Sequence, residues 1–231
     1  MKKRNGSKIT MAALMMMAAM AMTSCASSKK INGDSNASKD SEMGKNEEDL
    51  DNSYLVLSDT QQDIVKKNNA FALRLFNKVT DMESKVISPM SVSYLMGMLA
   101  NGADGITQQE ILKAIGCEGV SVSDLNELYK AMLLTANKQD KQTTVNIANY
   151  IAVNKNFQLN KDFCQKVSDS YLAGIESLDF TSSKSTDRIN GWCKEKTNGM
   201  IPRIIDQVSA DAVSYLMNAI YFKGTWQNKF N

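Results

Sequence analysis

Val213–Phe222, with the sequence VSYLMNAIYF, is a nearly unbroken run of apolar residues near the end of the chain. A run of this length bounded by a turn is typical of a β-strand that is buried on both faces, and Lys223-Gly224 is the expected turn. Such a strand needs neighbours along its edges and packed layers on its faces. Only a few residues follow it before Asn231. We therefore expect the chain to be the N-terminal part of a larger protein.

Upstream of this strand, apolar residues at helical spacing predict a series of helices. The periodic segments are Ile64–Val79, Met90–Leu99, Leu125–Ala136, Phe163–Tyr171 and Ile189–Lys196. Helix starts are expected at Asp59-x-x-Gln62, at Ser88-Pro89 and at Thr107-x-x-Glu110, which have the residue types of capping boxes or of an N-cap followed by proline. Helix ends are expected at Asn101-Gly102, Gly116, Gly174 and Asn198-Gly199. The helix after Pro89 has few polar positions, so we expect it to be central.

Two further segments have the pattern of strands. Apolar residues alternate with polar ones across residues 145–153, and residues 175–180 form a short strand-like segment. Strands scattered among helices without regular βα alternation favour an α+β fold, with helices packed on a mostly antiparallel sheet.

The N-terminus has the features of an export signal. A basic segment that includes Lys2, Lys3 and Arg4 precedes an uncharged apolar run, Ile9–Met22, which is too short to span a membrane. The small residues around Cys25 resemble the bacterial lipoprotein box, in which the cysteine becomes lipidated after cleavage. We therefore predict a signal peptide over residues 1–24 and an exported, membrane-anchored protein, periplasmic or at the cell surface. The alternative is a plain signal peptide and an extracellular protein, with Cys25 incidental.

The segment after Cys25 differs in composition from the rest. Residues 25–52 are mainly Ser, Lys, Asn, Asp, Gly and Glu, and are predicted to form a lipid attachment site and a disordered tether. Residues 53–231 are then the folded region, which is long enough for one core. The chain has 27 Lys and Arg against 25 Asp and Glu, and without the four basic residues of the signal the balance is 23 against 25. A near-neutral mature chain gives no support for nucleic-acid binding.

The sequence is poor in groups that carry catalysis. It contains no histidine, which excludes Ser-His and Cys-His catalysis and histidine metal sites from this chain. Cys117, Cys164 and Cys193 are odd in number and widely spaced, so they predict neither a disulfide framework nor a zinc site, and we expect Cys164 and Cys193 to be buried. No glycine-rich phosphate loop is present. We therefore expect no metal and no cofactor, and an enzyme is the least favoured class.

Several segments in order along the chain resemble the serpin family. They are NAFALRLF from Asn69, ISPMSVS from Ile87, ANGA from Ala100, TQQEIL from Thr107, INGWCKEKTNGMI from Ile189 and NAIYFKGTW from Asn218. The resemblance runs from about residue 60 to the end. It implies a metastable protease inhibitor with a large sheet and an exposed reactive loop. A target serine or cysteine protease cleaves that loop and is trapped as the loop inserts into the sheet.

The resemblance also limits what this chain can do. In serpins the reactive loop and its flanking strands lie near the C-terminus, so we expect the loop and about two fifths of the fold to be missing here. The predicted function is therefore that of a serine-type endopeptidase inhibitor in the complete protein, with no reactive centre in this chain. The alternative is a non-inhibitory binding or structural lipoprotein on the same scaffold. The hinge of the missing loop would discriminate between the two. Small hinge residues permit fast insertion and favour the inhibitor, whereas bulky or proline-rich hinges argue against it.

Site residues carried over from the resemblance are structural. Ser88 and Ser91 resemble the paired hydroxyls beneath the point where the serpin sheet opens, and Asn218 resembles the asparagine on the facing strand. We expect a Ser–Ser–Asn hydrogen-bonded cluster; the alternative is a plain N-cap and a locally satisfied asparagine. Trp226 resembles the tryptophan where loop insertion begins, although it also fits an ordinary aromatic at a strand end.

Other matched positions complete the comparison with the family. Asn190, Thr197 and Gly199 match the motif of the helix that lies across the sheet, and Gly199 is expected to need a positive φ. Ser84 departs from the asparagine that many serpins carry near this position. Lysines at positions 130, 138 and 141 lie on or after the helix that binds polyanions in some serpins, but a solvated helix face is the favoured interpretation.

Overall fold

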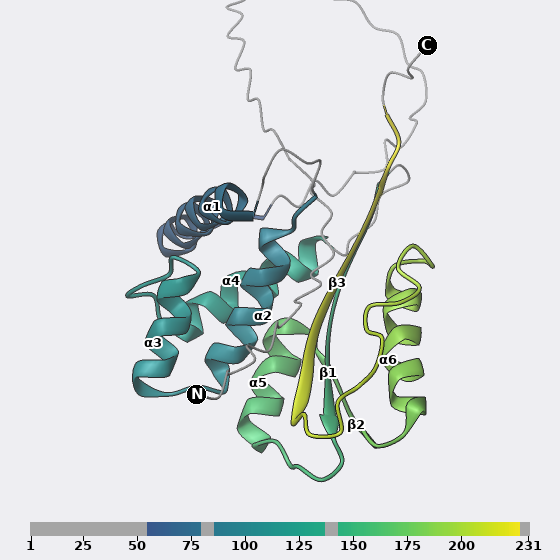
Figure 1. Ribbon diagram of the computed structural model, residues 1–231. Helices are drawn as coiled ribbons and strands as arrows, with labels where there is room; N and C mark the ends of the chain where they lie inside the picture. Colours follow the sequence, from purple (N-terminus) through teal and green to yellow (C-terminus); the bar gives the residue numbers. More distant parts are fainter. Residues whose placement is uncertain (1–54, 80–85, 137–142, 227–231) are drawn as a thin grey trace, which may run out of the picture. The chain divides into compact units, whose positions relative to one another are not determined.

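The computed structural model describes residues 55–79, 86–136 and 143–226 (Figure 1). The predicted signal peptide, Cys25, the tether, Ser84, Lys138 and Lys141 lie outside these residues. The described elements, in chain order, are α1 (Asp59–Val79), α2 (Pro89–Asn101), α3 (Gly105–Ala114), α4 (Val122–Ala136), β1 (Thr143–Asn154), α5 (Lys161–Tyr171), β2 (Gly174–Leu178), α6 (Ser183–Lys196) and β3 (Ser214–Gly224).

The described strands form one sheet with the order β2-β1-β3. β1 and β3 are antiparallel, with a register that runs from Thr143 opposite Gly224 to Val153 opposite Ser214. β1 and β2 are parallel over a shorter stretch, from Tyr150 opposite Gly174. The antiparallel ladder is the longer one, whereas the parallel pair was not expected. It arises because α5 is the crossover connection that a parallel pair requires.

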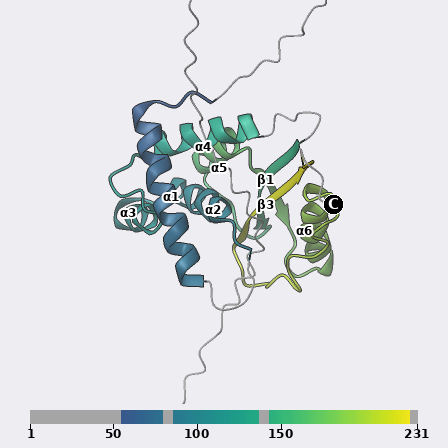
Figure 2. The same cartoon turned by 90° about the horizontal axis from the view of Figure 1, so that it is seen from above.

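Helices cover both faces of this sheet (Figures 1 and 2). Successive strand residues point to opposite faces, so Ile147 and Ile151 of β1 join the core formed with α1, α2, α4 and α5. Tyr150 and Ala152 point the other way and pack with α6. β3 divides in the same manner, with Leu216 and Ile220 on the first core and Met217 and Ala219 on the second. The sheet is therefore apolar on both faces.

The apolar run Val213–Phe222 lies in strand β3 from Ser214 onward, with two differences from the expectation. Met217 and Ala219 are buried, but the other residues of β3 are half-buried or exposed within the described residues. Lys223 and Gly224 do not form a turn, because β3 continues through them opposite Thr144 and Thr143. The prediction of a turn there was wrong because the pairing with β1, which is remote in sequence, extends the strand.

The starts of two helices differ from the expected positions. The capping box of α1 is Ser58 with Gln61, since Gln61 N donates to Ser58 Oγ over 3.3 Å and Ser58 N donates to Gln61 Oε1 over 3.1 Å. The predicted box at Asp59 was one residue too late. α3 begins at Gly105 with Asp104 as its N-cap, so the predicted start at Thr107 was also too late. In both cases an earlier residue of capping type supplies the acceptor oxygen.

The end of α5 also differs from expectation. The left-handed position is occupied by Leu172, with φ 51° and ψ 33°, whereas Gly174 already begins β2. The prediction that Gly174 ends the helix was wrong because the chain turns two residues earlier at a side chain that tolerates this conformation poorly.

α2 has the predicted start and end. Ser88 is its N-cap, Pro89 follows, and Gly102 is the C-cap. The helix is central, since it packs against α1, α3, α4, α5 and β3. Tyr94 and Met98 are fully buried, whereas Met90 and Leu99 are about two-fifths exposed, at 40% and 42%. The apolar surface of α2 is therefore wider than its covered face.

The cysteines and the hydropathy of the helices add little to the functional argument. Cys193 and Cys117 are buried, but Cys164 is only half-buried, so its predicted burial was wrong. No helix within residues 55–79, 86–136 and 143–226 combines the length and apolar character needed to cross a bilayer. Over the same ranges, no group of three His, Cys, Asp or Glu residues is placed to hold a metal ion.

Candidate functional site

The two matched serines lie together at the start of α2. Ser88 Oγ accepts a hydrogen bond from Ser91 N over 3.3 Å, and the two hydroxyl oxygens are 2.9 Å apart. Ser88 is buried and Ser91 is half-buried. The pair therefore caps the central helix at a point shielded from solvent.

Asn218 lies on β3 and forms a hydrogen bond with Asn149, which was not predicted as a site residue. Its Nδ2 donates to Asn149 Oδ1 on β1 over 2.8 Å, and Asn149 Nδ2 donates to the carbonyl oxygen of Tyr171 at the end of α5 over 2.7 Å. These bonds join β3, β1 and α5. The serine pair and the asparagine pair are separate networks, since no hydrogen bond among the described residues joins them.

A signal for Asn149 was present in the sequence. Asn149 is in phase with Ile147 and Ile151, so it is an amide on a face that is otherwise apolar. An amide in such a position needs hydrogen-bond partners. Its partner on β3 could not be identified, because that depends on the register between strands far apart in sequence.

Next to this network lies a cluster of three buried tyrosines. Tyr94, Tyr129 and Tyr171 contact one another edge-to-face, with ring centroids 5.0 to 6.4 Å apart. Burial is the main cause that raises the pKa of each hydroxyl well above its ordinary value. The cluster therefore stays neutral and serves packing and hydrogen bonding.

Two of these hydroxyls are tied to amides on neighbouring helices. Tyr171 Oη donates to Asn126 Oδ1 over 2.8 Å, and Asn126 exchanges hydrogen bonds of 2.8 and 2.9 Å with Asn101. Tyr129 Oη lies 3.0 Å from Asn68 Nδ2, which donates to it. Four helices, α1, α2, α4 and α5, are joined in this way.

Two buried polar atoms in this region lack a partner among the described residues: Tyr94 Oη and Asn218 Oδ1. Burial of an unsatisfied polar atom costs about 1–3 kcal/mol. Asn218 thus uses its amide nitrogen toward β1, while its amide oxygen contributes an energetic cost to the described fold.

The residues of the α6 motif hold the segment that follows this helix. Asn190 Oδ1 accepts from the backbone N–H groups of Ile204 and Ile205 over 2.8 and 3.1 Å, and Asn190 Nδ2 donates to Ile205 O over 3.0 Å. Thr197 Oγ1 donates to Cys193 O and accepts from Ile201 N. Gly199 has φ +84°, in the region predicted for it. The motif therefore organises backbone and leaves no group free for chemistry.

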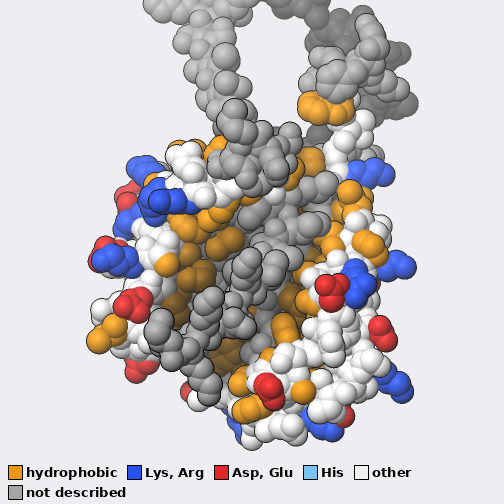
Figure 3. Space-filling model, viewed as in Figure 1, with side chains coloured by type: hydrophobic (Ala, Val, Ile, Leu, Met, Phe, Trp, Pro, Cys, Tyr) orange, Lys and Arg blue, Asp and Glu red, His pale blue; other side chains and the backbone are white. Residues whose placement is uncertain are grey.

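Trp226 is the last described residue and is 70% exposed. Other large apolar residues are also exposed, including Met90 and Leu99 on α2 and Phe222 on β3. In Figure 3 hydrophobic side chains gather on the described parts of this face of the molecule. The described fold thus presents apolar surface on the side where α2 and β3 meet.

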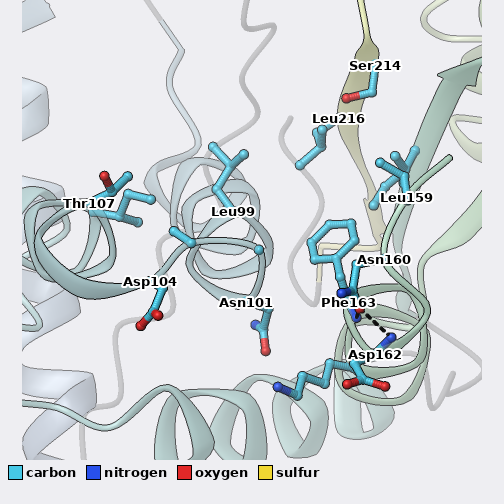
Figure 4. Close-up of a pocket in the computed structure, with 15 residues that line it drawn as sticks. Leu99, Asn101, Asp104, Thr107, Leu159, Asn160, Asp162, Phe163, Ser214 and Leu216 are labelled. Atoms are coloured by element: carbon cyan, nitrogen blue, oxygen red, sulfur yellow. Dashed lines mark hydrogen bonds between the residues drawn. The ribbon is translucent and has the colours of Figure 1, made fainter. Parts of the chain in front are cut away.

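A pocket of about 570 Å³ opens between α2, α3, α5 and the sheet (Figure 4). Leu99, Phe163 and Leu216 lie around it, and Asp104 and Asp162 lie along its lower side in this view. Two of its polar residues have structural roles, because Asp104 caps α3 and Asn160 caps α5. The pocket contains no arrangement of nucleophile and base.

The buried thiols of Cys117 and Cys193 have raised pKa values. Burial raises the pKa of the Cys117 thiol to about 11, which disfavours the reactive thiolate. Burial also raises the pKa of Cys193. Lys130, the one residue of the suggested polyanion site that the structure describes, is exposed on α4. The described polar groups hold the sheet and its helices in place.

Comparisons with known proteins agree with the sequence motifs. The family model described as Serpin (serine protease inhibitor) matches residues 66–231. Among curated relatives, serine protease inhibitor 42Dd of Drosophila melanogaster is 31% identical over 161 residues, and Iripin-1 of Ixodes ricinus is 33% identical over 171 residues. These alignments cover 68% and 71% of this chain but only 43% and 44% of the relatives. The chain thus spans less than half the length of these relatives.

Solved structures show the same partial overlap. The latent state of the thermophilic serpin tengpin matches with a TM-score of 0.70 and 31% identity. The match covers 76% of this chain and 47% of the tengpin chain. A loop C-sheet serpin polymer matches with a TM-score of 0.70 and 32% identity, over 76% of this chain and 46% of its own. Human thyroxine-binding globulin complexed with thyroxine is more distant, with a TM-score of 0.65 and 25% identity over 74% of this chain and 48% of its own.

Proposed function

This chain belongs to the serpin family, and from that premise we propose that it forms the N-terminal part of a serine-type endopeptidase inhibitor. The complete protein would trap a serine or cysteine protease by inserting its cleaved reactive loop into the sheet. The family model that matches residues 66–231 is described as Serpin (serine protease inhibitor), which supports the proposal.

The observation that carries this proposal is the pairing of β3. This 11-residue strand pairs with β1 along one edge, and among the described residues no strand pairs with its other edge. A long strand with an available edge is what strand addition requires. The sheet of this chain therefore has the geometry to accept further strands, including an inserted loop.

The reactive loop is proposed to come from sequence beyond Asn231. The chain covers 43% and 44% of two inhibitor relatives, and the family resemblance implies that the loop lies in the remaining part. Inhibition is thus a property of the complete protein that carries this chain.

The direct test is a protease panel applied to the complete protein. Trypsin-like, chymotrypsin-like, elastase-like and papain-like enzymes are each incubated with it, and complexes that resist detergent are sought by gel electrophoresis. A covalent complex with one of them is the expected result. Cleavage of the loop without any such complex would contradict the inhibitor and favour the binding or structural lipoprotein on this scaffold.

We also propose that the complete protein is exported and anchored through a lipid on Cys25. The apolar run before this cysteine and the polar segment after it support the proposal. Several acyl chains on one residue anchor firmly, since each buried CH₂ group contributes about 0.8 kcal/mol. Metabolic labelling with a palmitate analogue should mark the wild type and not Cys25→Ala. Equal labelling of both would contradict the anchor.

A further inference from the structure

α6 is attached to the sheet mainly through apolar contacts. Ile189, Trp192 and Cys193 of the helix share a buried cluster with Tyr150 of β1 and Met217 of β3. The Trp192 and Tyr150 rings are stacked, with centroids 5.0 Å apart and an angle of 18° between their planes. Such contacts hold a helix against a sheet but are not directional. Polar contacts add directional restraints on the position of this helix.

One polar cluster joins α6 to two strands at once. Arg188 of α6 binds Glu176 of β2 with two bonds, Nε to Oε1 over 3.1 Å and NH2 to Oε2 over 2.8 Å. Tyr150 of β1 donates its hydroxyl to Glu176 Oε2 over 2.7 Å. The Arg188 guanidinium also lies 5.9 Å from the centre of the Tyr150 ring. Paired bonds between a guanidinium and a carboxylate are the most geometrically specific ion pairs in proteins.

The segment after α6 is fastened to the helix itself. Asn190 binds the backbone at Ile204 and Ile205, and Thr186 Oγ1 accepts from Val208 N over 3.1 Å. α6 and residues 197–208 therefore form one layer. At the other end of the helix, Asn146 Nδ2 of β1 donates to Lys196 O over 2.8 Å.

We propose that Glu176 is the fixed point of a latch, formed with Arg188 and Tyr150, which holds α6 and residues 197–208 on the sheet and sets how readily this layer lifts from it. The carboxylate is suited to this because it binds both Arg188 of the helix and Tyr150 of the neighbouring strand. Glu176 lies on β2 and so ties the helix to the strand that is farthest from β3 in the described sheet. Loss of its charge would weaken both arms of the latch together, because charge-assisted hydrogen bonds are stronger than neutral ones.

The effect of the latch on loop insertion rests on the proposed function. The existence of the latch can be tested without it. If a loop inserts into the sheet, the strands must move relative to one another, and a helix fixed across them must yield. The latch would then control the rate of insertion. Lifting of the layer, by contrast, is measurable in the complete protein without any protease.

The test is hydrogen exchange of the complete protein, followed by mass spectrometry, with Glu176→Gln compared with wild type. We expect exchange in residues 183–208 to become roughly two- to fivefold faster, as for loss of a partly exposed ion pair, while exchange in α2 and α4 stays unchanged. Asp187→Asn is the matched control, since Asp187 is exposed on α6 and forms no ion pair or side-chain hydrogen bond among the described residues. It should leave exchange in α6 unchanged.

Charge reversal separates a latch from general destabilisation. Glu176→Arg should accelerate exchange in α6, and the double variant with Arg188→Glu should restore most of the protection. Unchanged exchange in Glu176→Gln, equal acceleration in α2 and α4, or no restoration in the double variant would each overturn the latch. If the latch holds but no protease is trapped, the proposed inhibitor fails and the latch stands.

Discussion

At the scale of single residues, Gly97 shows how tightly α2 packs. A methyl group at this position would lie 2.4 Å from Tyr171 Oη and 3.1 Å from the Tyr129 ring. In the complete protein, Gly97→Ala should therefore destabilise by about 1–3 kcal/mol, although alanine usually favours a helix. Gly191→Ala on α6 is the control, because its methyl would meet nothing within 4 Å. That variant should be neutral or more stable in thermal unfolding; equal loss in both would contradict the packing argument.

The asparagine pair gives a second prediction. Asn149→Leu removes the donor to Tyr171 O and the acceptor for Asn218 Nδ2, whereas Asn218→Leu removes one bond and one unsatisfied oxygen. We therefore expect Asn149→Leu to cost about 1–3 kcal/mol and Asn218→Leu to cost less, because unsatisfied buried groups dominate such losses. Asn218→Leu should also change the rate of spontaneous polymer formation. The reverse order of stability in denaturant unfolding, or an unchanged polymer rate, would count against this account.

Residue roles set by local backbone could be predicted from sequence, and those set by strand register could not. Ser88 is an N-cap and Gly199 has a positive φ, as predicted, since each depends only on its neighbours in the chain. The link between Asn149 and Asn218 depends on a pairing across 69 residues. The resemblance pointed to Ser88, Ser91 and Asn218, but the described bonds join the serines to each other and Asn218 to Asn149.

At the scale of elements, the end of α5 stores strain at an unusual residue. Leu172 has φ 51° and is 44% exposed, so its side chain gains little from burial. Leu172→Gly should be more stable than Leu172→Ala by about 1 kcal/mol, because both remove the side chain but only glycine adopts this conformation without strain. Thermal unfolding of the two variants of the complete protein measures the difference. A glycine variant no more stable than the alanine variant would contradict the strain.

The existence of the helices was predictable, while their first residues were less so. Apolar periodicity located α1, α2, α4, α5 and α6 because the buried faces recur at a fixed spacing, whereas a capping pattern located α3. The start of α3 was placed late because Asp104 and Thr107 are both suitable caps, and local sequence does not choose between them. The parallel pairing of β1 with β2 was not predicted, since it is decided by how α5 packs back on the sheet.

At the scale of the whole molecule, the described fold exposes surfaces typical of an interior. β3 is apolar on both faces and pairs with a described strand on one edge only, and Leu99 and Phe222 are partly exposed. Exposed apolar strand edges promote association. The family comparison agrees, since this chain covers less than half of the matched relatives. We therefore propose, as the central claim, that β3 and α2 belong to a core that further sequence completes.

The measurement that tests this claim most directly is light scattering after gel filtration of residues 26–231 expressed alone. We expect these residues to elute as aggregate, to bind a hydrophobic dye and to form no detergent-resistant complex with the four classes of protease named above. The physical reason is that a net stability of about 5–15 kcal/mol cannot survive loss of a large share of a core. A monomer with a sharp cooperative melt would contradict the claim, and so would a covalent complex with any of these proteases.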